Sequence, residues 1–483
     1  MNFATFESAS DWSPPAPLPR AKPLGPIALL RTIYNNPLEA WTQAHFEKPI
    51  VTSRLIGTQV AVVSEPSAIR RVLLDNAVNY RKDWLQQRIL SNGLAGGLLS
   101  AEGEQWRMQR RSLSPVFARR TVMSFAPAMT AAVATLLERW RGCEGKIIDV
   151  AADVTRVTLD ILRQTIFSEG LGQDPEKFRI VMTEFFDAIG RIDALDVLGA
   201  PNVLPRMGRW KARPALRFFD KAIDTIIATR RQTLAENPGS VPKDILTLLL
   251  QTQDPETGRA MSEAEVRANI ITFISAGHET TANTLTWSLY LLSQTPTWRE
   301  RVAVEAKREF EGGPIDTLAD RLIETRAVID EAVRLYPPIA AISRTAIAPD
   351  QLCDVPIKGG ALVAIAPYVL HRHRALWDRP DVFDPGRFLN GGREKIDRYA
   401  YLPFGAGARI CIGATFALQE ATLVLASIMK HFTLELAPGH AVRPILRVTL
   451  RLQGGLPMIV RSREANILTA GTHEATSQPA NVA

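Results

Sequence analysis

The chain has 483 residues, of which 46% are hydrophobic and 22% are charged, a mixture that excludes a disordered, collagen-like or coiled-coil protein. The net charge of +7 is compatible with nucleic-acid binding, but no motif that reads DNA or RNA is present, so we favour a soluble enzyme with a basic patch for an acidic partner. Three scattered cysteines exclude a disulfide scaffold and a zinc site built from paired cysteines, and they fit a reducing cytoplasm.

The chain begins with a proline-rich lead, residues 1–26, which we expect to be extended and stiff. No stretch of about 18 apolar residues occurs, so neither a signal peptide nor a membrane-spanning helix is expected. Alternating β-branched residues predict a hairpin over Ile50–Val63. Helical periodicity follows and predicts four helices, over Pro66–Asp75, Glu102–Leu113, Val122–Trp140 and Val150–Phe167.

The middle of the chain contains a predicted loop and the longest predicted helix. Glycines and prolines between Arg191 and Pro214 indicate a mobile loop, and a helix is expected over Ala215–Leu234. Ser262 followed by Glu265 is a capping-box signature. The helix that starts there meets no proline before Pro296 and is about 50 Å long. Because it is apolar on nearly every face, it should run through the core.

The last third mixes strands, irregular chain and one more helix. A helix ends at Pro337, strand-like residues extend over 339–370, an irregular segment over 371–404, a helix over Gly413–His431, and strands to Val460. We expect residues 463–483 to form a disordered tail. The predicted fold class is mainly α with a smaller β-rich part (α+β), in one domain over residues 27–462.

Cys411 lies where a glycine-rich loop meets the start of a helix. Backbone N–H groups at such a position stabilise a thiolate. One interpretation is a buried cysteine with only a structural role. A dinucleotide-binding loop is excluded, because position 410 is Ile instead of the third glycine and no strand precedes it. The remaining interpretation is a thiolate ligand to haem iron.

The residues around Cys411 resemble the haem-binding loop of the cytochrome P-450 family, Phe-x-x-Gly-x-Arg-x-Cys-x-Gly. Phe404, Gly407, Arg409, Cys411 and Gly413 match its five fixed positions. The resemblance implies a P-450 fold that holds haem b (iron protoporphyrin IX) between the long central helix and the helix after the cysteine loop. It also implies that Cys411 is the axial metal ligand, that Phe404 and Gly413 belong to the cofactor site, and that Arg409 pairs with a haem propionate.

A second motif is Glu331-x-x-Arg334, which places both side chains on one helix face. Such a pair is usually a weak surface salt bridge. It gains weight from Arg387 in the stretch Pro-Gly-Arg-Phe, because the family completes this pair with a second arginine. The resemblance implies a structural triad of Glu331, Arg334 and Arg387 that locks the segment presenting Cys411.

A third motif is Ala276-Gly277-His278-Glu279-Thr280-Thr281, midway along the long helix. The non-functional interpretation is a cluster of polar side chains in the core that satisfy one another's hydrogen bonds. The pattern resembles the oxygen-binding motif of the family, which implies that Thr280 holds dioxygen and a water by hydrogen bonds and that Glu279 feeds protons. His278 occupies the variable position and is expected to have no ligand role.

Three further side chains resemble partners of the haem propionates. Trp106 and Arg110, spaced i, i+4, would alone be read as a surface pair. The family uses this pair at the haem, and it places another propionate partner at the position of Arg344. The family's substrate contacts fall here on mostly apolar positions and imply a hydrophobic substrate such as a terpenoid, fatty acid or aromatic compound; they are Leu94, Leu98, Leu99, Phe185, Phe273, Ala276, Ile339, Ala340, Ala341 and Ile342.

The resemblance implies a monooxygenase that inserts one oxygen atom of O2 into a hydrophobic small molecule by hydroxylation or epoxidation. Electrons would come from a separate ferredoxin or flavodoxin with its NAD(P)H reductase, docked on basic residues that include Arg107, Arg111, Arg119 and Arg120. We expect a cytoplasmic monomer that binds no nucleic acid. A peroxide-driven enzyme and a non-enzymatic haem sensor or ligand carrier remain open alternatives, although the Glu279–Thr280 pair speaks against both.

Overall fold

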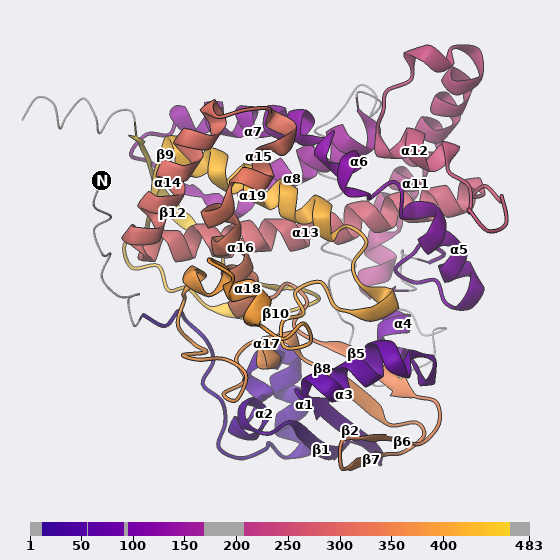
Figure 1. The fold of residues 1–483 in the computed structure, drawn as a ribbon, viewed down its shortest axis with the longest axis vertical. Coiled ribbons are helices and arrows are strands. Elements are labelled where there is room, and N and C mark those ends of the chain that lie inside the picture. The colour runs from indigo at the N-terminus through magenta and orange to yellow at the C-terminus, as the bar shows by residue number, and fades with distance from the viewer. Residues whose placement is uncertain (1–11, 56, 91–94, 169–206, 464–483) are drawn as a thin grey trace, which may run out of the picture.

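The computed structural model describes residues 12–55, 57–90, 95–168 and 207–463. These residues form a large helical part and a smaller β-rich part, which occupy the top and the bottom of Figure 1. The predicted fold class, mainly α with a smaller β-rich part, is therefore confirmed.

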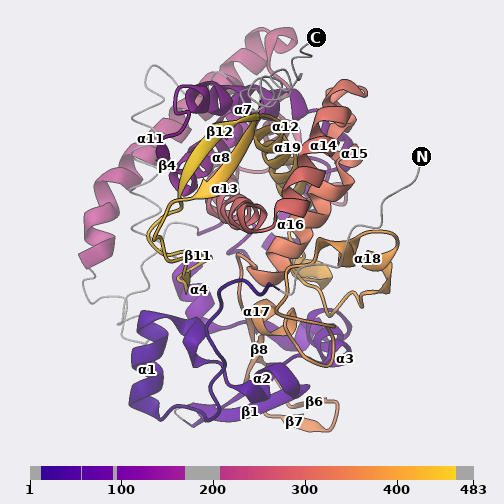
Figure 2. The same ribbon diagram turned by 90° about the vertical axis from the view of Figure 1, so that its left-hand side faces the viewer.

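The helical part is built around α13 (Glu263–Gln294), seen nearly end-on at the centre of Figure 2. The N-terminus of α13 carries the predicted capping box, because the Ser262 hydroxyl accepts the Glu265 N–H while the Glu265 carboxylate accepts the Ser262 N–H. The helices that contact α13 are α8 (Val150–Phe167), α11 (Met207–Glu236), α12 (Ile245–Gln251), α14 (Pro296–Glu311), α16 (Ile323–Leu335) and α19 (Ala414–His431). The helical part also contains α5 (Gly103–Leu113) and α7 (Ala126–Arg141).

Gly277 lets α8 approach α13 closely at the middle of the long helix. A Cβ atom at this position would lie 3.2 Å from a methyl group of Leu162 on α8. The Thr158 hydroxyl of the same helix donates to the carbonyl oxygen of Thr155 at 2.9 Å and also lies 3.4 Å from the carbonyl oxygen of His278. Helix α8 thus packs directly against α13 at Gly277 and His278.

The β-rich part contains a five-stranded sheet in the order β1-β2-β8-β5-β3. The hairpin of β1 and β2 pairs Ile50 with Val63, as predicted, and β2 pairs in parallel with β8. The strands of this sheet are β1 (Ile50–Leu55), β2 (Thr58–Val63), β3 (Tyr80–Lys82), β5 (Ile342–Ala346) and β8 (Leu362–Ile365). Smaller sheets comprise β4 (Ile147–Asp149) with β12 (Pro457–Ser462) and β9 (Phe432–Leu436), β6 (Asp350–Leu352) with β7 (Val355–Ile357), and β10 (Pro444–Leu446) with β11 (Leu450–Leu452).

Short helices connect these parts. They are α1 (Pro26–Asn35), α2 (Gln43–Glu47), α3 (Pro66–Arg70), α4 (Trp84–Leu90), α6 (Arg119–Met123), α15 (Leu318–Arg321), α17 (Pro367–Leu370) and α18 (Gly392–Lys395). Among the described residues, one helical stretch, Arg119–Arg141, is long and apolar enough to cross a membrane by composition. This stretch covers α6 and α7, which pack against α19, and α7 also packs against α8, so the contacts are those of a core helix.

Several predicted boundaries are wrong. The helix predicted over Val122–Trp140 is two helices, α6 and α7, because Pro127 starts a new first turn, where its missing N–H costs nothing. The loop predicted up to Pro214 is helical from Met207 onward. Pro214 lies inside the thirty-residue helix α11, where tertiary context overrides its low helix propensity. Residues 191–206 of that loop and the tail 464–483 lie outside the described residues. The strand-like run to Leu370 ends in the helical turn α17, which begins with Pro367.

Candidate active site

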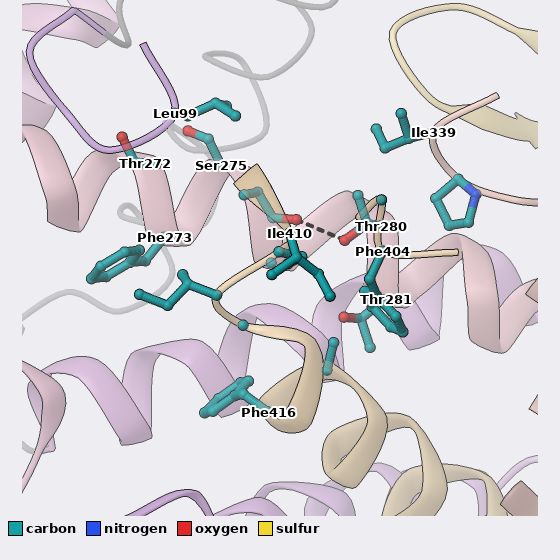
Figure 3. A pocket seen from close by; sticks show the side chains of 18 of the residues that line it. Leu99, Thr272, Phe273, Ser275, Thr280, Thr281, Ile339, Phe404, Ile410 and Phe416 are labelled. Atoms are coloured by element: carbon teal, nitrogen blue, oxygen red, sulfur yellow. Dashed lines mark hydrogen bonds between the residues drawn. The ribbon is translucent and has the colours of Figure 1, made fainter. Parts of the chain in front are cut away.

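A cavity of about 430 Å³ lies between the middle of α13 and the loop that precedes α19. Figure 3 shows Phe273 and Thr280 on α13, Ile410 on the loop and Phe416 on α19 around this space. Its walls are mostly apolar, with a few charged and polar side chains at defined places. Such a lining is typical of a site for a flat or hydrophobic small molecule.

The loop that carries Cys411 is shaped by glycines. Gly407 has φ +69°, and a Cβ atom there would lie 1.9 Å from the carbonyl oxygen of Leu73. No other residue fits this position without moving the backbone. The Cys411 N–H donates to the carbonyl oxygen of Phe404, and Arg110 donates to the carbonyl oxygen of Ile410 at 2.9 Å. The loop is therefore fixed from two sides, with Gly413 as the residue before α19.

The Cys411 side chain is accessible because it faces the cavity, while protein surrounds it elsewhere. Burial raises the pKa of its thiol, and the N–H of Gly413 and the charge of Arg110 oppose this effect only in part. The loop alone thus does not keep this sulfur ionised. A metal cation does so, because a coordinating thiol is deprotonated outright. An accessible sulfur in an apolar cavity fits the iron of the haem that the sequence resemblance implies.

A cluster of cations lines one side of the same cavity. The cluster consists of Lys82, Arg344 and Arg409. The carboxylate of Glu102 lies 3.0 Å from the Lys82 Nζ and 3.1 Å from an Arg409 nitrogen, while the charges of Glu102 and Asp83 both act on Arg344. Burial, followed by repulsion from Arg409, lowers the pKa of Lys82 to about 8, and burial lowers the pKa of Arg409 to about 10. Burial also lowers the pKa of Arg344. This excess of buried positive charge fits a ligand with two carboxylates, as the propionates of haem would supply.

Trp106 and Arg110 of α5 both line the cavity. The guanidinium of Arg409 lies over the Trp106 ring, 3.9 Å from its centroid. Arg110 contacts the cysteine loop through Ile410, and burial lowers its pKa. Helix α5 thus stabilises both the cation cluster and the loop.

The motif of α13 presents two groups with different partners. The Thr280 hydroxyl donates to the carbonyl oxygen of Ala276 at 2.6 Å, marked by the dashed line in Figure 3. Glu279 accepts a hydrogen bond of 2.7 Å from Thr449. Both line the cavity, whereas His278 is buried and its pKa falls to about 4 because of that burial. His278 is therefore a neutral, buried residue of α13.

The structure brings Glu331, Arg334 and Arg387 together in a buried cluster. Arg334 donates to both carboxylate oxygens of Glu331 at 2.6 and 2.7 Å, and Arg387 lies 3.4 Å from Glu331 Oε1. Arg334 also donates to the carbonyl oxygens of His371, Pro380 and Val382. Neither Glu331 nor Arg334 has any exposed side-chain surface. The cluster thus ties the irregular segment 371–388 to α16.

The predicted substrate contacts are only partly brought together. Six of them line the cavity: Leu98, Leu99, Phe273, Ala276, Ile339 and Ile342. Ala340 and Ala341, just before β5, are not among the residues that line the cavity: Ala340 packs into the core and Ala341 is exposed. Leu94 and Phe185 lie outside the residues whose side chains the structure describes.

Sequence reasoning missed several lining residues. Lys82 at the end of β3, Phe117 after α5, and Val448 and Thr449 in the turn between β10 and β11 all face the cavity. Lys82 is the last residue of the three-residue strand β3 and stands in no motif, so its only sequence signal is a lysine at the end of a short strand. Thr449 adjoins alternating apolar residues and has no sequence signal of its own.

Comparisons with known proteins agree with this geometry. The chain matches the cytochrome P450 family over residues 14–458. Cyclooctatin synthase of Streptomyces melanosporofaciens is 31% identical over 448 residues, 92% of this chain and 95% of that protein. Cyclooctat-9-en-7-ol 5-monooxygenase of the same organism is 29% identical, covering 89% and 92%, and a cytokinin hydroxylase of Arabidopsis thaliana is 28% identical, covering 87% and 82%.

The solved structures lead to the same result. The crystal structure of the cytochrome P450DA heme domain superposes with a TM-score of 0.80 at 26% identity, over 93% of this chain and 98% of that one. A family match over nearly the whole chain accompanies relatives named as a monooxygenase and a hydroxylase. The chain belongs to the cytochrome P450 family and is a haem monooxygenase.

Proposed function

We propose that this enzyme holds haem b and inserts one oxygen atom of O2 into a hydrophobic small molecule by hydroxylation or epoxidation. The observation that carries the proposal is one apolar cavity with Cys411 on the loop side and Glu279 and Thr280 on the α13 side. When bound, the haem supplies the iron at which O2 is reduced and from which oxygen is transferred. The remaining tasks fall to side chains of this chain.

Cofactor binding is assigned to the loop and the cation cluster. Cys411 donates its thiolate to the iron, and the raised pKa of the free thiol means that binding releases its proton. Arg344, Arg409 and Lys82 neutralise the propionates, with Trp106 and Arg110 supporting them. Phe404 and Gly413 line the site on either side of the cysteine.

Proton supply is assigned to α13. The Thr280 hydroxyl, now bonded to the carbonyl oxygen of Ala276, can turn to hold dioxygen and a water molecule. Glu279 supplies protons to that water and regains them from solvent. An acid–alcohol pair has a use in reductive cleavage of O2, and a mere sensor or carrier has no such need.

The proposed substrate is an apolar small molecule. Leu98, Leu99 and Phe273 offer no charged partner to a ligand, so contact area and shape decide binding. A terpenoid, fatty acid or aromatic compound fits this chemistry. A panel of such compounds, screened for displacement of the iron-bound water by the change in the haem spectrum, identifies the class.

Electrons are proposed to come from a separate acidic ferredoxin or flavodoxin with its NAD(P)H reductase, in the cytoplasm. Supporting this, α5 contacts the cysteine loop through Arg110 and exposes Arg107, and exposed Arg119 and Arg120 lie at the start of α6. Arg111 is removed from the docking set, because its guanidinium is held at 2.8 Å by two oxygens of Asp254, whose side chain is fully buried.

Turnover tests the proposal directly. Product formation with a ferredoxin, its reductase and NADPH is expected to exceed formation with hydrogen peroxide alone. Turnover by peroxide only would replace the proposal with a peroxide-driven enzyme. A haem protein that binds gases but turns over no compound with either supply would be a sensor or carrier.

A further inference from the structure

The turn between β10 and β11 reaches the acid of α13 through Thr449. The Thr449 side chain is 4% exposed, and its hydroxyl donates to Glu279 Oε1 at 2.7 Å. The amide of Asn283, one helical turn beyond Glu279, donates to the Thr449 oxygen at 3.1 Å. A threonine hydroxyl has one proton to give, so these two bonds give the chain a direction, from Asn283 through Thr449 to Glu279.

Arg451, two residues after Thr449, contacts the same carboxylate oxygen. Its guanidinium lies 3.9 Å from Glu279 Oε1, and its side chain is 46% exposed. At this distance and exposure the pair is weak, and solvent screens it further. Thr449 is therefore the contact that fixes the carboxylate, while Arg451 supplies a diffuse positive charge at its solvent side.

The hydrogen bond from Thr449 fixes the orientation of the Glu279 side chain, which α13 alone does not fix. Glutamate has several side-chain rotamers, and an acid that relays protons must reach both the cavity and water. Backbone position on α13 limits where the carboxylate lies but does not select a rotamer. A hydrogen bond from a separate, buried segment does select one.

We propose that Thr449 is a positioning residue that holds Glu279 in the orientation from which it delivers protons to the oxygen site at Thr280. This inference rests on the proposed monooxygenase function. In each transfer Glu279 gives its proton to a water held near Thr280 and regains one from solvent water. Thr449 keeps its own proton and only orients the acid.

The test uses the full-length haem-loaded enzyme with Thr449→Val, Thr449→Ser and a matched control, Thr433→Val on β9. Loss of one hydrogen bond to a charged group is expected to lower the product formed per NADPH about tenfold in Thr449→Val. The missing product should reappear as hydrogen peroxide. Thr449→Ser keeps the hydroxyl and should restore coupling, and Thr433→Val should behave as the parent.

A second measurement does not depend on turnover. Urea unfolding of the parent, Thr449→Val, Glu279→Gln and the double variant gives the coupling between the two side chains. Thr449→Val is expected to change the unfolding equilibrium constant about tenfold when Glu279 is present and clearly less in the Glu279→Gln background.

The outcomes separate this inference from the function on which it rests. A parent enzyme that makes no product with ferredoxin and NADPH defeats both the proposed function and the positioning role. A productive parent whose Thr449→Val variant stays fully coupled overturns the positioning role alone. Failure of Thr449→Ser to restore coupling, or additive unfolding effects, would overturn it as well.

Discussion

Glu331→Gln is predicted to destabilise the protein strongly although it changes one atom. The Glu331 carboxylate and the Arg334 guanidinium are both fully buried, and two hydrogen bonds of 2.6 and 2.7 Å join them. The carboxylate also accepts the N–H of Asp384 at 2.8 Å and neutralises Arg387 at 3.4 Å. The amide of glutamine keeps the shape but removes the charge, so two guanidiniums remain with no counter-charge at this point.

Breaking a buried ion pair from one side costs about 3–5 kcal/mol, because the partner charge stays buried. We expect a loss of that size in the free energy of unfolding, measured by urea titration followed by circular dichroism. Because Arg334 anchors the carbonyl groups of segment 371–388, loss of haem should accompany the loss of stability. The matched control is Glu435→Gln, which breaks the exposed pair of Glu435 with Arg461 and should cost under about 1 kcal/mol. A change at Glu331 as small as that of the control would refute the reasoning.

Three further predictions follow from the site. Gly407→Ala places a methyl group against the Leu73 carbonyl oxygen at positive φ. The free energy of unfolding should fall by about 1–3 kcal/mol or more, and haem retention should weaken. Haem retention equal to that of the parent would contradict the close approach of Gly407 to Leu73. Lys82→Met removes one cation of the cluster and should speed haem transfer to a haem-free acceptor protein about tenfold, and an unchanged rate would show that Lys82 is not a propionate partner. Burial lowers the pKa of His371 to about 3, so the unfolded chain takes up a proton below pH 6.5 that the folded chain does not. The contribution of His371 to the free energy of unfolding is therefore full above pH 6.5 and falls towards pH 3. The difference in free energy of unfolding between the parent and His371→Asn should shrink by about 2 kcal/mol between pH 7 and pH 5. A difference that stays constant would contradict a neutral, buried imidazole.

The parts of the fold that sequence predicted well are those where one local signal dominates. Capping by Ser262 and an unbroken apolar pattern define α13, and alternation defines the hairpin of β1 and β2. Two predictions about prolines failed. Pro127, in the first turn of α7, was a local signal for a new helix start that the apolar pattern masked, whereas Pro214 lies inside α11, where tertiary context overrides its propensity.

The candidate site shows the same limit in another form. Cys411, Glu279 and Glu331 stand in local motifs, and each motif could be read without knowing the fold. Lys82 and Thr449 carry no motif, because their relevance comes from chain segments that are distant in sequence, such as Glu102 for Lys82 and Glu279 for Thr449. Only tertiary structure brings these partners together.

The central claim is that Cys411 ligates haem iron as a thiolate. The most direct measurement is the absorption spectrum of the reduced, carbon-monoxide-bound protein, recorded for the parent and for Cys411→Ser. The account predicts a thiolate-type Soret band in the parent and its loss in the variant. An imidazole-like band in the parent, or a thiolate-type band that survives in Cys411→Ser, would contradict the assignment.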